Sequence, residues 1–458
     1  MVDPVSYDEF IASVSGPLGW FFVLLTVMNL VAAARTVLGR DGTTLLQWKR
    51  FRLVSGQLWV VLAVWFAIQA VLCFRADPTS MAWVAMPNWA KQWVDHWMSP
   101  TWYTIGLLGG LLGMFLARRF FVRPPVAWLM LNLSMWFLGA SLTDQNFYQI
   151  VSKPDNVPIV GMVYLLGFFT WMSAYRAVQN DDRLARGEPP LEAVDDEKTL
   201  VWPDLVYIEL ICMVAVTAVL IVWAIVLKAP LEEPANAAHT PNPSKAPWYF
   251  LGLQELLVYF DPWLAGVVLP GLILFGLIAI PYLDPNPEGV GYYTILKRPF
   301  AYVVFQFGFL GLWISLILMG TFLRGPNWSF FGIYETWDVH KSATLQHYNL
   351  SDYFWIWMLG RELPTASADA GMGGRVAVIL WRELPGLLLM TLYFIGLPIL
   401  AASRIPLFRQ LYAQMGWPRF AVMMLLLMWM ILLPIKMVAN WQLNLQYFVA
   451  IPEWTLNL

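Results

Sequence analysis

Residues 240–262 read TPNPSKAPWYFLGLQELLVYFDP, and they stand between two apolar segments that are each long enough to cross a membrane. Pro241, Pro243 and Pro247 keep the first part extended, because proline lacks an amide donor and disfavours helix at the residue before it. Pro247 also suits the start of a helix. The sequence therefore predicts a proline-rich loop followed by an amphipathic helix near 248–259 that lies in the membrane interface.

This predicted helix begins with three aromatic residues, Trp248, Tyr249 and Phe250, and then carries the polar pair Gln254 and Glu255. Aromatic rings with polar tips favour the depth of the membrane interface. A polar pair within such an aromatic surface suits a large, flat, apolar ligand that bears oxygen atoms, and a quinone has that chemistry. We therefore expect the helix to form part of a quinone-binding surface.

The composition places the chain among integral membrane proteins. Its 458 residues are 59% hydrophobic and 13% charged, with a mean hydropathy of +0.59. The net charge of −2, without a basic stripe, argues against nucleic-acid binding. Cys73 and Cys212 both lie in apolar runs and are expected to be buried thiols, and no CxxCH motif is present for a covalent haem. The N-terminal MVDPVSYDEF lacks a basic region ahead of an apolar core, so we expect no cleaved signal peptide.

Ten apolar stretches are long enough to span a bilayer, whose hydrocarbon core takes roughly 20 helical residues. They lie near 17–36, 54–74, 102–120, 125–142, 158–176, 205–228, 262–283, 300–322, 385–403 and 419–438. Ten spans place five basic connections on one side, which the positive-inside rule makes cytoplasmic, so both termini are expected to face outward. The basic residues of these connections are Arg35, Arg40, Lys49, Arg50, Arg52, Arg118, Arg119, Arg123, Arg183, Arg186, Lys198, Lys297, Arg298, Arg404, Arg409 and Arg419.

The connection 179–200 is the most polar in the chain and is the natural boundary between two membrane domains. The first five spans show no metal-ligand spacing, phosphate-binding loop or paired carboxylates, and their role is open. We expect five regions: a five-span domain at 1–178, a cytoplasmic linker at 179–200, a membrane domain at 201–322, an outward loop at 323–384, and two further spans with an outward tail at 385–458.

Five motifs in order make residues 200–322 resemble the C-terminal half of cytochrome b, and especially subunit IV of cytochrome bf-type complexes. They are WPDLVYI (202–208), EEPANAAHTP (232–241), PWYF (247–250), LPGLILFGLIAIPYLDPNP (269–287) and KRPFA (297–301). PWYF is similar to the end of the family's quinol-site motif, Pro-Glu-Trp-Tyr. The resemblance implies that Pro247, Trp248, Tyr249, Phe250 and Gln254 border a quinol oxidation site on the outer side of the membrane.

The sequence departs from that motif at its carboxylate. Aligning Trp248 and Tyr249 with the motif puts Ala246 where the family has proline and Pro247 where it has glutamate. Glu255 is the nearest substitute, about 10 Å further along the helix axis at 1.5 Å per residue. Our hypothesis is that Glu255 accepts the quinol proton with the help of Tyr249. The alternative is that Glu255 faces water or caps a neighbouring loop.

Two further carboxylates stand at the start of the span near 205–228. Asp204 precedes it, and Glu209 lies one turn inside. The resemblance places this helix entrance near an inner quinone site, where the two groups would relay protons. The alternative is that Glu209 reaches the interface or pairs with an arginine of a partner.

The four histidines do not fit a haem site. His96, His239, His340 and His347 all lie in predicted outward loops, whereas a b-type haem between membrane helices takes paired histidines deep within the spans. We therefore expect no metal ligand in this chain. His239, close to the quinol-site loop, either contacts a docking iron–sulfur domain or is simply exposed.

The resemblance implies an all-α subunit, not catalytic alone, of a quinol:cytochrome c (or similar acceptor) oxidoreductase. Its expected partners are a haem-bearing cytochrome b N-terminal-type subunit, a Rieske iron–sulfur protein and a cytochrome c subunit, in a dimeric complex of a bacterial inner membrane. Two alternatives stay open: a scaffold subunit whose quinol site has lost its function, and a membrane transporter. The scarcity of charges in the spans disfavours the transporter.

Overall fold

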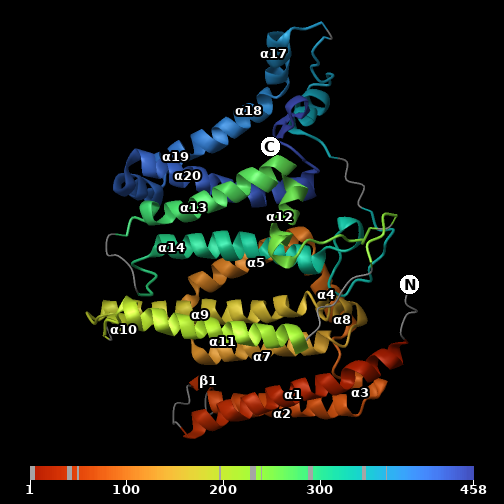
Figure 1. Ribbon diagram of the computed structural model, residues 1–458, viewed down its shortest axis with the longest axis vertical. Helices are drawn as coiled ribbons and strands as arrows, with labels where there is room; N and C mark the ends of the chain where they lie inside the picture. The colour runs from red at the N-terminus through yellow and green to blue at the C-terminus, as the bar shows by residue number, and fades with distance from the viewer. Residues whose placement is uncertain are drawn as a thin grey trace.

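The protein is an all-α membrane protein. The computed structural model describes residues 6–38, 44–48, 51–194, 197–226, 234–238, 240–286, 292–342, 347–367 and 369–458. Most of the long helices run side by side in a common direction, with α17 and α18 rising from one edge (Figure 1). Within the described residues, β-structure is limited to the short antiparallel pairs β1–β2 (Thr44–Trp48, Phe51–Val54) and β3–β4 (Ala450–Ile451, Leu456–Asn457) and two isolated bridges.

The helices of the N-terminal part lie before the polar connection 179–200 and, at the end of α9 and in α10, within it. They are α1 (Tyr7–Leu38), α2 (Ser55–Phe74), α3 (Pro78–Ala82), α4 (Asn88–Trp97), α5 (Pro100–Leu116), α6 (Arg118–Phe121), α7 (Pro124–Ser141), α8 (Gln145–Val151), α9 (Val157–Ala185) and α10 (Leu191–Val194). Asp144 shows how a boundary is set, because its carboxylate accepts hydrogen bonds from the backbone N–H groups of Asn146 and Phe147 and so caps α8.

The C-terminal part contains α-helices interrupted or extended by π-helical turns. The α-helices are α11 (Val206–Val226), α12 (Trp248–Tyr259), α13 (Leu269–Leu283), α14 (Pro299–Val304), α15 (Ser315–Leu318), α16 (Leu350–Asp352), α17 (Met372–Arg382), α18 (Leu384–Thr391), α19 (Leu397–Arg404) and α20 (Pro406–Leu443). The π-helical segments are Val201–Leu205, Leu264–Val268, Phe305–Ile314, Met319–Leu323, Tyr353–Met358 and Leu392–Gly396, and single 3₁₀ turns occur at Pro326–Trp328 and Pro452–Trp454.

Within the described residues, all ten apolar stretches predicted to span the membrane fall on helices. Eight of the described helical spans are long and apolar enough to cross a bilayer: Tyr7–Leu38, Ser55–Phe74, Val157–Ala185, Val201–Val226, Leu264–Leu283, Pro299–Leu323, Leu384–Arg404 and Pro406–Leu443. A ninth candidate is the pair α7 and α8, which bends by 114°, and α5 is a shorter apolar helix. The interfacial helix predicted near 248–259 is α12.

The connections gather at the two ends of the helices in the predicted way. β1, α10, the end of α13 and the start of α14 lie at one end, on the left of Figure 1. The first turn of α1, α3, α4, α8 and α12 lie at the other end. The C-terminal tail joins the second group, because Asn457 Nδ2 donates a 2.7 Å hydrogen bond to Asp261 just after α12. Which end faces the cytoplasm stays a prediction.

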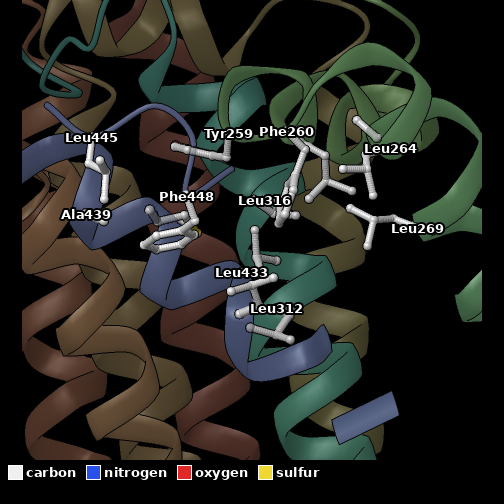
Figure 2. Packing of buried hydrophobic residues seen from close by; sticks show 14 of the residues in the cluster. Tyr259, Phe260, Leu264, Leu269, Leu312, Leu316, Leu433, Ala439, Leu445 and Phe448 are labelled. Atoms are coloured by element: carbon white, nitrogen blue, oxygen red, sulfur yellow. The ribbon is translucent and has the colours of Figure 1, made fainter. Parts of the chain in front are cut away.

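The largest core cluster lies beneath α12. Tyr259, Phe260 and Leu264 lie in one cluster with Leu316 and Leu433, which belong to α15 and α20 (Figure 2). Phe448 of the C-terminal tail packs against the same cluster. These residues are nearly inaccessible, and close packing of this kind sets the position of an interfacial helix. The core therefore holds α12 against the ends of two membrane spans.

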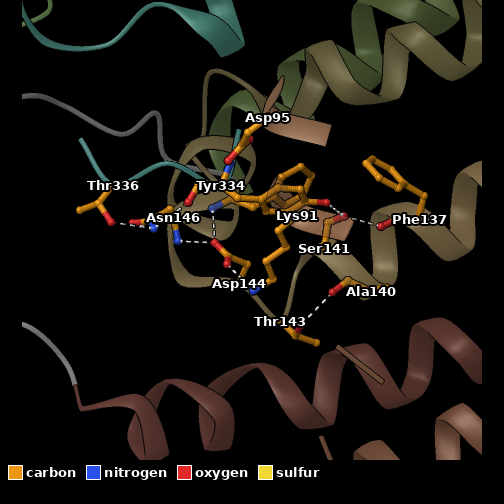
Figure 3. A network of polar contacts seen from close by, with 11 residues as sticks. Lys91, Asp95, Phe137, Ala140, Ser141, Thr143, Asp144, Asn146, Tyr334 and Thr336 are labelled. Atoms are coloured by element: carbon orange, nitrogen blue, oxygen red, sulfur yellow. Dashed lines mark hydrogen bonds and ion pairs between the residues drawn. The ribbon is translucent and has the colours of Figure 1, made fainter. Parts of the chain in front are cut away.

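Polar contacts also join α12's end of the molecule to the N-terminal part. Lys91 of α4 pairs with Asp144 at 2.6 Å, and Asp95 accepts a hydrogen bond from the backbone N–H of Tyr334 (Figure 3). The Tyr334 hydroxyl lies 2.6 Å from Oγ of Ser141 at the end of α7. The loop after the span Pro299–Leu323 is thus bound to α4 and α7 by hydrogen bonds.

Helix α5 packs against the C-terminal part as well. The Tyr103 hydroxyl donates to the carbonyl of Ser315, and Gln442 Nε2 donates to Thr101 Oγ1. These contacts join α5 to residues of the C-terminal part, and the boundaries of the five predicted regions stay a prediction.

Helix α11 behaves differently from every other long helix. None of its residues is buried within the described chain. Cys212, expected to be a buried thiol, is exposed on α11, and this expectation was wrong because an apolar run does not reveal whether its helix has a neighbour. Cys73 of α2 is buried, as expected.

Candidate functional site

The proline-rich loop is held against α12 by one side chain. Gln254 Oε1 accepts a 2.8 Å hydrogen bond from the backbone N–H of Ala246, and its Nε2 donates at 2.9 Å to the carbonyl of Ser244. Gln254 was predicted to border a quinol, and the structure shows it engaged with the loop. Its role in ligand binding stays a prediction, and its observed contacts fix the backbone that leads into Pro247.

The first turn of α12 presents the aromatic residues that the sequence singled out. Tyr249 and Phe250 are each 51% exposed, and Pro247 beside them is exposed too. The ring centroids of Tyr249 and Phe250 lie 4.8 Å apart. The Trp248 ring contacts the Tyr249 ring edge to face, with the centroids 5.6 Å apart. The structure thus brings Pro247, Trp248, Tyr249 and Phe250 together as one partly exposed aromatic surface.

Glu255 lies apart from this surface, inside the protein. Its side chain is fully buried and pairs with Arg324, with Nη2 to Oε1 at 2.5 Å and Nε to Oε2 at 3.0 Å. The Tyr259 hydroxyl donates to Oε1 at 2.8 Å, and Trp328 Nε1 donates to Oε2 at 3.2 Å. Both carboxylate oxygens are therefore engaged by groups of the protein itself. The alternative that Glu255 faces water was wrong.

Electrostatics and aromatic contact stabilise this cluster. Burial alone would lower the pKa of the Arg324 guanidinium, but the adjacent Glu255 carboxylate raises it above its usual value. Burial, and then the charge of Glu255, raise the pKa of Tyr259 well above 10, so its hydroxyl keeps its proton. The guanidinium also lies 3.6 Å from the ring centroid of Phe330. A bidentate, buried pair of this kind connects α12 to the end of the neighbouring span.

Arg324 was missed in the sequence. It is the first charged residue after the span predicted at 300–322, and it precedes a Gly-Pro pair that turns the chain. A cationic side chain just after a membrane span is common at the membrane interface. The pairing of Arg324 with Glu255 is therefore revealed only by the position of Arg324 relative to α12. Lys436, which falls inside the span predicted at 419–438, was the more visible signal.

Lys436 is a buried ammonium in an aromatic setting. It is 1% exposed, and its Nζ lies 4.8, 5.0 and 5.8 Å from the ring centroids of Phe260, Tyr447 and Phe448. Its Nζ has no hydrogen-bond partner among the residues that the structure describes. Cation–π attraction therefore joins the end of α20 to the end of α12 and to the C-terminal tail.

The two carboxylates predicted near an inner quinone site lie at the start of the helical span that contains α11. They are distant in sequence from α12. Asp204 and Glu209 are both exposed, and neither forms a salt bridge within the described part of the protein. Their role in an inner quinone site stays a prediction.

The histidines that the structure describes, His96, His340 and His347, are all exposed. His239 lies outside the described residues. Within the described ranges, no group of three or more His, Cys, Asp or Glu side chains is placed to hold a metal ion. Bis-histidine ligation of a haem between spans does not fit these positions.

The fold and the site define an α-helical membrane protein with an aromatic interfacial helix clamped between its spans. Residues 234–336 match the family described as Cytochrome b(C-terminal)/b6/petD, so this part of the chain is a cytochrome b C-terminal-type region. The match covers less than a quarter of the chain and includes α12, α13, the span Pro299–Leu323, Glu255 and Arg324. The match supports the assignment of this chain as a membrane subunit of a cytochrome bc-type complex. WPDLVYI lies ahead of the matched residues, and no solved structure matches the chain.

Proposed function

We propose that this chain is a membrane subunit of a bc-type complex that oxidises quinol, and that the aromatic surface of α12 forms part of its outer quinol site. The observation that carries the proposal is the partly exposed surface of Pro247, Trp248, Tyr249 and Phe250 within the cytochrome b-type region. Flat aromatic side chains at an interface suit the ring of a quinol, and the apolar spans beside them suit its tail.

The electron acceptors belong to partners in this proposal. A haem-bearing cytochrome b N-terminal-type subunit, a Rieske iron–sulfur protein and a cytochrome c subunit would supply the redox groups, because the described histidines do not fit a haem site. Helix α11 has no buried residue within the described chain, so its exposed surface is available for contact with such a partner in the membrane. Tyr249 and Glu255 remain predicted proton-handling groups. For Glu255 this role requires its pair with Arg324 to open during turnover.

The test uses the native complex purified with its partner subunits and a short-chain quinol as the substrate. Replacing both rings, Tyr249→Ala with Phe250→Ala, removes two aromatic contacts of about 1 kcal/mol each. We expect KM for the quinol to rise by about tenfold or more while the complex still assembles. Trp89→Ala is the matched control, because Trp89 is an exposed aromatic residue at the same end of the molecule, on α4.

A scaffold subunit is the second candidate, and one observation favours it. Pro247 stands where a carboxylate is expected, and both oxygens of Glu255 are engaged internally. A scaffold predicts that the double variant assembles and turns over quinol like the wild type. That result would contradict a quinol site at α12.

A further inference from the structure

A lysine lies in the loop that Gln254 holds against α12. Lys245 is half-buried, and its Nζ donates a 2.8 Å hydrogen bond to the backbone carbonyl of Thr321. The same Nζ lies 5.6 Å from the ring centroid of Trp337. The amine therefore stands where the loop before Pro247 meets the last turn of the span Pro299–Leu323.

The surroundings of this amine disfavour its charged form. The pKa of the Lys245 ammonium is lowered to about 7, first by burial and next by the charge of Lys153; Glu255 opposes this and Arg324 adds to it. Because Glu255 and Arg324 neutralise each other as a pair, they leave little net charge to hold a proton on Nζ. Near neutral pH, Lys245 is present both as ammonium and as free amine.

The residue that accepts the hydrogen bond of Lys245 also carries an unpartnered hydroxyl. Thr321 is 1% exposed, and its Oγ1 has no hydrogen-bond partner in the described part of the chain. Buried hydroxyl groups are normally hydrogen-bonded, so an unpartnered one on the residue whose carbonyl accepts from Lys245 indicates a place for a further polar group. A quinol hydroxyl has the donor and the acceptor that such a pair requires.

We propose that Lys245 is the catalytic residue that accepts a proton from the quinol, with the Thr321 hydroxyl orienting the quinol oxygen. This proposal rests on the proposed function of the aromatic surface of α12. It places the base two residues before Pro247, on a loop that Gln254 fixes. Lys245 then takes the place of Glu255 as the proton acceptor, and the pair of Glu255 and Arg324 stays closed as a structural contact.

The chemical step is a balanced proton transfer. One O–H bond of the quinol breaks, its proton forms a new N–H bond with the lone pair of Lys245 Nζ, and the bonding electrons stay on the quinol oxygen. The two electrons would pass to one-electron acceptors that the proposed partner subunits hold, an iron–sulfur cluster and a b-type haem. The second hydroxyl proton leaves to the aqueous phase, the quinol becomes quinone, and the ammonium returns its proton to water.

The native complex, with a short-chain ubiquinol or menaquinol, tests this role through the pH profile of kcat. Below about pH 7 the amine is protonated and accepts no proton, so wild-type kcat should rise with pH through that value. Lys245→Met and Lys245→Arg should each lower kcat by roughly 100-fold, since a general base contributes at least that much, with little change in KM. Arginine keeps the positive charge and the donor but accepts no proton.

Two further variants separate proton transfer from structure. Lys153→Met removes a cation that lowers the pKa of Lys245, so the rise of kcat should move to higher pH while its maximum is kept. Lys198→Met, in the polar connection 179–200, is the matched control and should change neither kcat nor its pH profile.

The outcomes are distinguishable. Full activity of Lys245→Arg, or a pH profile that Lys153→Met leaves in place, would overturn the catalytic role and leave the proposed function standing. A wild-type complex that oxidises neither quinol would overturn both. Loss of activity in Lys245→Arg, with normal assembly and quinol affinity, supports the proposal.

Discussion

At the residue scale, the pair of Glu255 and Arg324 decides how α12 is held. The two side chains come from positions 69 residues apart, and both are almost fully buried. Taking two charges out of water is costly, and the close bidentate contact and the added bonds from Tyr259 and Trp328 offset that cost. Removing one partner leaves the other charge buried and unpaired.

We expect Arg324→Met to lower the free energy of unfolding by about 3–5 kcal/mol, the usual cost of breaking a buried pair. Glu255→Gln should destabilise too, and the double variant should be more stable than the sum of the single effects predicts, by about 1–3 kcal/mol. Unfolding in mixed detergent micelles measures all three. Glu335→Gln breaks the half-exposed pair with Lys341 and should cost less than about 1 kcal/mol. Additive effects at Glu255 and Arg324 would show that the pair is not coupled.

At the scale of the element, α12 and its preceding loop form one unit. The helix begins directly after Pro247 and ends at Tyr259, and the core beneath it includes α15 and α20. Gln254 reaches back from the second turn of α12 to both sides of Lys245. One amide side chain therefore fixes the loop backbone on both sides of Lys245 relative to α12.

We expect Gln254→Leu to loosen this loop without unfolding α12. Losing a net hydrogen bond of about 1 kcal/mol should speed hydrogen exchange at the Ala246 amide by roughly fivefold, while the amides of α12 keep their protection. Hydrogen exchange followed by mass spectrometry measures this change. Gln442→Leu removes an amide side chain bonded to Thr101 on α5 and serves as the control. Unchanged exchange at Ala246 would mean that Gln254 does not hold the loop.

At the scale of the whole molecule, α11 is a membrane helix with no buried residue, whereas the other spans pack against neighbours. Its first turns carry Glu209, exposed in an otherwise apolar helix. A carboxylate at such a position is costly against lipid unless it reaches the interface or meets a polar partner. The surface of α11 is therefore the face at which we expect a membrane partner to bind.

The different exposure of Cys212 and Cys73 allows a labelling test of whether a partner covers α11. In the isolated chain, an apolar maleimide should label the exposed Cys212 of α11 and leave the buried Cys73 unmodified. In the complete complex, a partner that covers α11 should protect Cys212 as well. Mass spectrometry of the labelled peptides measures both. Equal labelling of Cys212 in the isolated chain and in the complex would show that α11 faces lipid.

The sequence alone determined the elements that depend on local chemistry. Long apolar runs must be helical in a bilayer, because no water is present to satisfy backbone groups. All ten predicted spans fall on helices where the structure describes them, and eight of these helical spans, or nine with the bent pair, are long enough to cross a membrane. Pro247 and the aromatic residues after it predicted α12 with its observed bounds. The ordered motifs predicted the cytochrome b-type region that the family match confirms.

Only the tertiary structure decided which side chains meet. It turned Glu255 into the core against Arg324, directed Gln254 to the loop, placed the Lys245 amine on Thr321 and left Cys212 exposed. These contacts join residues that are distant in sequence, and no local preference for helix or turn encodes them. Their physical reason is packing: hydropathy places each helix in the membrane, but the fit of side chains between helices selects the neighbours.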